Sequence, residues 1–100
     1  TALNDDSPYV RIAAAQSLGQ FGNDADLKAA LPVLLDLAAL DRNEIYISMS
    51  ALNAIDDLGD RAVSGRELLS KLPRKGNGVP GRMGAYINNL LTRILEKLPE

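Results

Sequence analysis

The chain of 100 residues contains no cysteine and no histidine. Without cysteine it can form no disulfide framework, no thiolate metal site and no cysteine nucleophile. Without histidine it lacks the commonest general base and the commonest transition-metal ligand. An enzyme acting on its own is therefore the least favoured function for this chain, and the sequence predicts no metal and no cofactor.

Aromatic side chains are also scarce, with no tryptophan, one phenylalanine and three tyrosines. Alanine and leucine are abundant instead, which favours helices packed closely across small side chains over a sheet. No apolar run reaches the ~20 residues that a membrane-spanning helix requires. We therefore expect a single all-α domain with a modest core and no contact with a membrane.

Apolar spacing and capping residues together predict five helices. They cover about residues 8–21, 25–40, 44–58, 60–72 and 81–98. Ser7 supplies a hydroxyl N-cap for the first helix, and Pro8 stands at its first helical position. Gly22 is expected to close this helix in the left-handed conformation. Asp41 and Asn43 are candidate caps for the third helix.

Three further expectations concern the interior of the helices. Apolar residues at three- and four-residue steps are expected to turn one stripe of the first helix toward the core. The stripe consists of Val10, Ala14, Leu18 and Phe21. Pro32 predicts a kink in the second helix near residues 29–32. Gly65 weakens the first half of the fourth helix, because glycine inside a helix costs about 1 kcal/mol relative to alanine.

A shift of 37 residues superimposes one part of the chain on another. It lays "ALNDDSPYVRIAAAQSLGQFG" on "ALDRNEIYISMSALNAIDDLG", so that Tyr9 falls on Tyr46 and Gly22 on Gly59. A further shift of 40 lays Tyr46 on Tyr86. A period of this length that holds two helices is typical of an α-solenoid, in which helical pairs stack and share one core. Each tyrosine is therefore expected at the edge of the core, beside an inward Val10, Ile47 or Ile87.

The first copy resembles the second helix of a HEAT repeat. Its matching residues are Asp6, Val10, Arg11, Ala14, Ala15, Leu18 and Gly22. The second copy keeps Asn43, Ile47, Ala51, Leu52 and Gly59 but has Ser48 in place of the arginine. The resemblance implies a short α-α superhelix (a HEAT-like, armadillo-like solenoid) with copies at about residues 2–38, 39–72 and 73–100. Because Thr1 to Leu3 look like the tail of another helix, we expect a fragment of a larger protein.

A second resemblance concerns the run "ALPVLLDLA…YISMSALNAID.LG.RA…LP", which is similar to helical extensions at the C-terminus of bacterial sulfatases. It implies a non-catalytic scaffold or docking module that packs on a catalytic domain of the same chain or on another subunit. A periplasmic or exported location would follow. That family's nucleophile is a Cys or Ser followed by any residue, then a Pro and shortly an Arg. The segment from Ser7 to Arg11 contains Ser, Pro and Arg, but at the wrong spacing, so the signature is absent. A free-standing HEAT-repeat adaptor for protein–protein interaction is the alternative.

Positive charge gathers in the last forty residues, which hold eight basic and three acidic side chains. Arg74, Lys75 and Arg82 flank the start of the predicted last helix, whose free N–H groups and dipole favour an anion or an acidic partner. The intervening "GNGVPG" satisfies G-x-G-x-x-G. However, a helix rather than a strand precedes it, so we expect a connector and not a nucleotide site.

Two carboxylate pairs, Asp5-Asp6 and Asp56-Asp57, raise the question of a calcium site. They lie far apart in the repeat, whereas calcium needs six to eight converging oxygens, so capping and solvation account for them better. Nucleic acid is not an expected partner either. The net charge is −2, and the first sixty residues carry only three basic side chains.

Overall fold

The computed structural model describes residues 3, 5–40, 43–72 and 81–98, and the side chains from residue 84 onward in the last segment. Its elements are α1 (Pro8–Phe21), α2 (Asp24–Leu37), α3 (Ile45–Leu58), the 3₁₀ helix η2 (Gly59–Gly65), α4 (Arg66–Ser70) and α5 (Gly81–Lys97). No strand occurs in these residues. The all-α prediction is confirmed.

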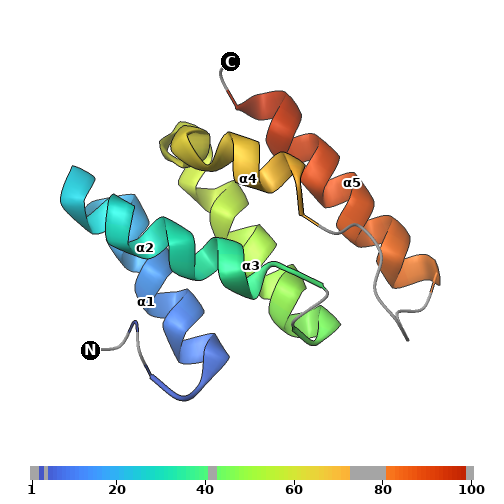
Figure 1. Cartoon of the computed structure of the whole chain (residues 1–100), viewed down its shortest axis with the longest axis horizontal. Coiled ribbons are helices and arrows are strands. Elements are labelled where there is room, and N and C mark those ends of the chain that lie inside the picture. Colours follow the sequence, from blue (N-terminus) through green and yellow to red (C-terminus); the bar gives the residue numbers. More distant parts are fainter. Residues whose placement is uncertain (1–2, 4, 41–42, 73–80, 99–100) are drawn as a thin grey trace.

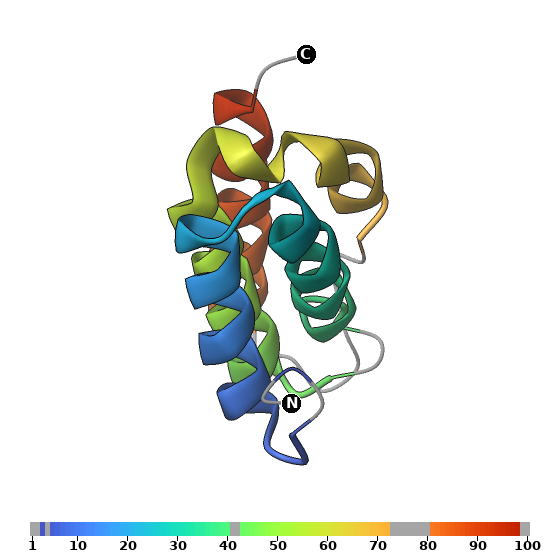
Figure 2. The ribbon, with the colours of Figure 1, turned by 90° about the vertical axis from the view of Figure 1, so that its left-hand side faces the viewer.

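The helices form two layers. Helices α1, α3 and α5 lie side by side and run in the same direction, while α2 and the η2–α4 segment form the second layer (Figures 1 and 2). Helix α2 packs against both α1 and α3, and η2–α4 continues its layer over α3 and α5. The helices that follow each other in the chain therefore alternate between layers, as in a solenoid.

The core lies between these layers and consists mainly of leucine, isoleucine and alanine. The largest side chains with almost no exposed surface are Leu34, Leu37, Ser48, Leu52, Ile55, Leu69, Ile87 and Leu91. Small residues let the backbones approach closely. Gly65 shows this best, because a Cβ atom added there would lie 3.1 Å from Cδ2 of Leu31 and 3.2 Å from Cδ1 of Leu35.

That close approach also explains why the predicted fourth helix is divided. Residues 59–65 form a 3₁₀ helix, and only Arg66–Ser70 is α-helical. Gly65 marks the junction, where its lack of a side chain admits the leucines of α2. The second helix ends at Leu37 rather than at residue 40, and its helical assignment is unbroken through Pro32.

The caps of α1 agree with the sequence at its start and differ at its end. The N–H of Val10 donates to Oγ of Ser7 at 3.5 Å, which confirms the N-cap. Gly22 is extended, with φ −84° and ψ 179°, so the left-handed closure predicted for it is wrong. The reason is Asn23, which begins α2 at once through a capping box with Asp26. Gly59 does adopt positive φ, at 59°.

The prediction that Asn43 caps the third helix is also wrong. Its Nδ2 donates to the carbonyl oxygens of Asp36 at 2.8 Å and Ala39 at 3.0 Å, so it satisfies the end of α2 instead. The N-cap of α3 is Glu44, which makes no side-chain capping bond. Asp41, the other candidate cap, lies outside the described residues.

The buried side of α1 matches the predicted stripe only in part, since Leu18 packs against the core but both ends of the stripe are exposed. Val10 is 42% exposed and Phe21 is 83% exposed, whereas Ile12, Ala15 and Gly19 are buried. Helix α1 carries apolar residues on both sides, and only the side toward α2 and α3 is covered by other described helices (Figure 2). The helix neighbours therefore decide which apolar stripe becomes core.

Candidate functional site

One face of the molecule, turned away from α2 and α4, carries repeat-equivalent residues on three parallel helices. We call it the ladder face. It consists of Tyr9, Gln16 and Gln20 on α1, Tyr46, Asn53 and Asp57 on α3, and Tyr86, Arg93 and Lys97 on α5. The 37- and 40-residue shifts place these residues in three rows, each of which crosses all three helices. The rows are Tyr9–Tyr46–Tyr86, Gln16–Asn53–Arg93 and Gln20–Asp57–Lys97.

Helical spacing accounts for the ladder face. On α3 the exposed Tyr46, Asn53 and Asp57 stand seven and four residues apart, which puts them on one side of the helix. The fully buried Leu52 and Ile55 lie between them in sequence and point elsewhere. The same spacing recurs on α1 and α5, so the three helices present the same side to solvent.

The tyrosine row is the most exposed aromatic feature of this face. Tyr9, Tyr46 and Tyr86 are 50%, 52% and 44% exposed. Each therefore buries about half of its surface and presents the rest to solvent, which confirms their expected place at the edge of the core. Such aromatic side chains bury much area on contact while losing few rotatable bonds.

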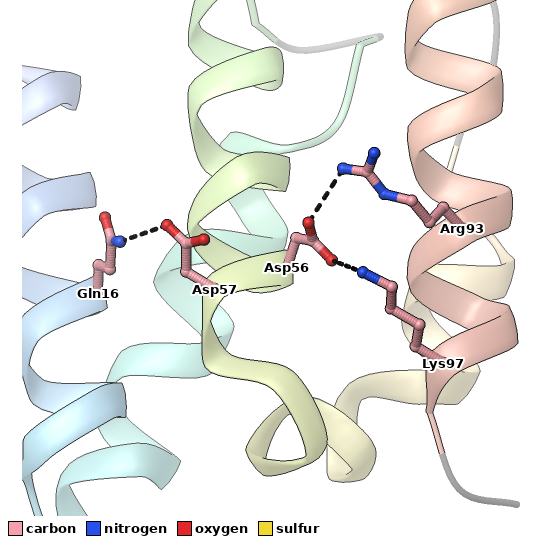
Figure 3. A network of polar contacts seen from close by, with 5 residues as sticks. All are labelled: Gln16, Asp56, Asp57, Arg93 and Lys97. Carbon is pink, nitrogen blue, oxygen red and sulfur yellow. Dashed lines mark hydrogen bonds and ion pairs between the residues drawn. The ribbon is translucent and has the colours of Figure 1, made fainter.

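Polar contacts join α1 to α3 along the ladder face. Nε2 of Gln16 donates to Oδ2 of Asp57 at 2.8 Å (Figure 3). Nε2 of Gln20 donates to the carbonyl oxygen of Asp57 at 3.2 Å. Both donors come from α1 and both acceptors from the last turn of α3. The two helices are therefore held in a fixed register at this end.

Ion pairs join α3 to α5 beside these contacts. Oδ2 of Asp56 lies 3.0 Å from Nη2 of Arg93, and Oδ1 lies 3.7 Å from Nζ of Lys97 (Figure 3). The side chain of Asp56 is only 17% exposed, while those of Arg93 and Lys97 are 54% and 63% exposed. The cations thus keep much of their surface available to a partner.

These contacts correct the expectation for Asp56-Asp57. The sequence favours capping and solvation for this pair, but the pair links three helices, because each carboxylate has its partner on a neighbouring helix. Asp5 fits the expectation better, since its Oδ1 accepts the N–H of Ser7 at 2.9 Å just before α1. Among the described residues, no three acidic side chains converge as a metal site would require.

A shallow hollow adjoins the tyrosine row on α5. It has a volume of about 280 Å³, and Tyr86, Asn89, Leu90 and Arg93 line it. Leu90 is buried and forms its apolar part, whereas the other three are exposed. The hollow can receive a small side chain of a partner next to the Arg93 guanidinium.

The predicted anion site stays a prediction. Arg74 and Lys75 lie outside the described residues, and Arg82 belongs to α5 with its side chain outside them. The structure instead brings together Arg93 and Lys97, two basic residues of the same C-terminal region. The sequence feature that could have identified Arg93 and Lys97 is the 40-residue shift, which aligns them with Asn53 and Asp57.

None of the described helices is long and apolar enough to cross a bilayer. The family model for HEAT repeats matches residues 1–72, which include α1 to α4. No curated protein and no solved structure matches the chain. The match covers more than half of the sequence and agrees with the two-layered helical stacking. The chain belongs to the HEAT-repeat family.

Proposed function

We propose that the chain is a non-catalytic scaffold that binds a protein partner across the ladder face. HEAT repeats are generally protein-interaction scaffolds, and their fold is generally non-catalytic. One observation carries the choice of face. Tyr9, Tyr46 and Tyr86 stand in register, half-exposed, on three parallel helices. Tyrosine is enriched at protein interfaces and at their energetic centres.

The rows below the tyrosines define the chemistry of the partner. Asn53 offers an exposed amide, whose oxygen and nitrogen can pair with the backbone of an extended segment. Arg93 and Lys97 add positive charge at the α5 end, offset in part by Asp56. We therefore propose a partner segment that crosses the three helices and carries a carboxylate near α5.

The proposal is tested by replacing the three tyrosines together with serine. Affinity capture from extracts of the native source, with parent and variant as baits, identifies a protein that depends on the tyrosines. Its Kd is then measured with purified components. We expect the triple variant to bind at least about tenfold more weakly, because several half-buried aromatic anchors are lost at once. Its thermal unfolding midpoint will fall, because each ring buries about half of its surface, so binding is compared at a temperature where circular dichroism shows both proteins folded.

Leu68→Ser is the matched control. Leu68 is 58% exposed but lies on α4, in the other layer of the molecule. Near it, Leu31, Leu35 and Pro32 line a groove of about 160 Å³ between α2 and the η2–α4 segment. Loss of binding in Leu68→Ser together with full binding in the tyrosine variant would move the interface to that groove and contradict the proposal.

The finer form of this proposal is a docking module in the C-terminal part of a sulfatase-like hydrolase. It is supported by the similarity of residues 30–73 to such extensions. A free-standing adaptor is the alternative. The coding sequence upstream distinguishes them, because a catalytic domain with a Cys/Ser-x-Pro-x-Arg signature supports the hydrolase, and further HEAT repeats alone support the adaptor.

A further inference from the structure

We propose that the outer side of α1 is the stacking surface for a further HEAT-type repeat that precedes α1 in the same polypeptide. This side, the α1 end face, consists of Val10, Ala13, Ser17 and Phe21. These residues follow each other at three- and four-residue steps and form one stripe. All four are exposed, and Phe21 is the most exposed large apolar side chain of the described residues, at 83%.

The repeat shows what covers this stripe elsewhere in the molecule. On α3 the equivalent positions are Ile47, Ser50, Ala54 and Leu58, all buried or half-buried. On α5 and the residue that follows it they are Ile87, Leu90, Ile94 and Leu98, all at most 6% exposed. Helix α3 turns this stripe toward α1, since Leu58 lies against Gly19. The same stripe on α1 is thus a standard contact surface whose partner helix is missing from the residues that the structure describes.

The far end of the stack has the opposite character. The outer side of α5 carries Asn89, Thr92 and Glu96, all exposed. Its equivalents on α1 are Ile12, Ala15 and Gly19, which are buried against the next helix. A polar outer side is what closes the end of a repeat array. The outer side of α5 is therefore polar, whereas that of α1 is apolar.

This difference argues against a second copy stacked head to tail, and the sedimentation measurement below tests a symmetric pair. In a head-to-tail pair, the α1 end face would meet the exposed Asn89 and Glu96 of another molecule, and their polar groups would lose water against an apolar surface. A repeat helix of the α1 type offers an apolar side with small residues instead. Gly19 receives Leu58 in this way. Phe21 is the equivalent of Leu58, so its partner helix should present a small residue as well.

The order of helices places the occupant in the same polypeptide. In the stack, α2 precedes its partner α3, and the η2–α4 segment precedes α5. Neighbouring units in such arrays follow one another in the chain. By the same order, α1 would be preceded in the chain by its own partner helix, as α3 is preceded by α2. Before that partner would come a helix equivalent to α1 from the preceding repeat. These two helices would cover the α1 end face. The inference does not depend on the ladder face being the binding surface.

The test extends the chain with its own repeat. A copy of residues 2–38 is inserted before residue 2 of the parent, which preserves the 37-residue period and puts a Gly19 opposite the original Phe21. We expect amide exchange in the original α1 to slow by at least about tenfold, because its outer side becomes buried. Phe21→Ser in the original copy should lower the urea midpoint of the extended chain and leave that of the parent unchanged.

Two results would overturn the proposal. One is amide exchange in α1 of the extended chain that is as fast as in the parent, together with a urea midpoint that Phe21→Ser leaves unchanged. This result would mean that the added repeat does not stack on α1. The other is a parent chain that sediments as a dimer and becomes a monomer in Phe21→Ser, which would assign the α1 end face to a second copy. A loss of tyrosine-dependent binding would alter neither measurement, so failure of the proposed function remains distinguishable.

Discussion

Leu58 of α3 lies against Gly19 of α1, so closely that a Cβ atom at position 19 would stand 2.6 Å from Cδ2 of Leu58. Gly19 itself is buried. The absence of a side chain there sets the distance between the two helices. A side chain added at position 19 would therefore have to displace the methyl groups of Leu58.

Gly19→Val should lower the free energy of unfolding by about 1–3 kcal/mol, because the added methyl groups overpack this contact. Urea unfolding followed by circular dichroism measures the change. In the Leu58→Ala background the same substitution should cost less, with a coupling energy of about 0.5–3 kcal/mol. Equal costs in both backgrounds would show that Leu58 is not the residue that excludes a side chain. Ala13→Val, on the exposed side of α1, is the control and should change stability by no more than about 0.5 kcal/mol.

Val10→Asp and Ile87→Asp form a matched pair at repeat-equivalent positions. Val10 is 42% exposed in the first turn of α1, where a carboxylate interacts favourably with the helix dipole, so stability should stay within about 0.5 kcal/mol. Ile87 is fully buried, and a charge there should cost more than about 4 kcal/mol. Thermal unfolding compares the two. Unfolding by Val10→Asp would show that the α1 end face is covered in the folded chain.

Arg66→Met tests a link between the layers. Nη1 of Arg66 donates to the carbonyl oxygen of Leu95 at 2.6 Å and lies 3.5 Å from that of Leu98, so a cation meets the end of α5. We expect a loss of about 1–2 kcal/mol, since the bond is charge-assisted and partly buried. Lys71→Met is the control, because the Lys71–Glu67 pair is 68% and 82% exposed and contributes about 0.5 kcal/mol or less. Equal losses of unfolding free energy in Arg66→Met and Lys71→Met would show that Arg66 does not link the two layers.

Asp56→Asn tests the ion pairs between α3 and α5. Removing the carboxylate charge should cost about 1 kcal/mol at low salt, because Arg93 and Lys97 share one half-buried acceptor. The cost should shrink in 1 M NaCl, where the Debye length is about 3 Å. Denaturant unfolding at both salt concentrations gives the comparison. Glu96→Gln, on the exposed side of α5, should show neither effect, and a salt-independent cost for Asp56→Asn would point to packing rather than charge.

Much of the fold follows from local sequence patterns. Apolar spacing and caps such as Ser7 predict all-α structure and place most helix boundaries within a few residues. The 37-residue shift correctly aligns Tyr9 with Tyr46 and predicts their shared place at the core's edge. These features depend on the residues of one helix or on the repeat itself, and both are visible along a single chain.

The remaining features depend on neighbours that no local pattern specifies. Val10 aligns with the buried Ile87 and is nevertheless exposed, because burial needs a second helix on that side. Asp56 looks like a solvated residue at a helix end until α5 brings Arg93 within 3.0 Å. Asn43 resembles an N-cap, but the turn carries its amide back to α2. In each case the deciding contact comes from another element of the fold.

Side-chain hydrogen bonds found between different helices of the described segments, such as those of Arg66 and Gln16, span 29 to 41 residues of sequence, which is about one repeat. Each links a helix to its neighbours in the stack and none requires the two ends of the chain to meet. Such local connectivity lowers the contact order and shortens the loops that folding has to close. We therefore expect helices α1, α2 and α3 to pack together on the ribosome before the residues of α5 have been synthesised, so that α5 docks last on the surface they form.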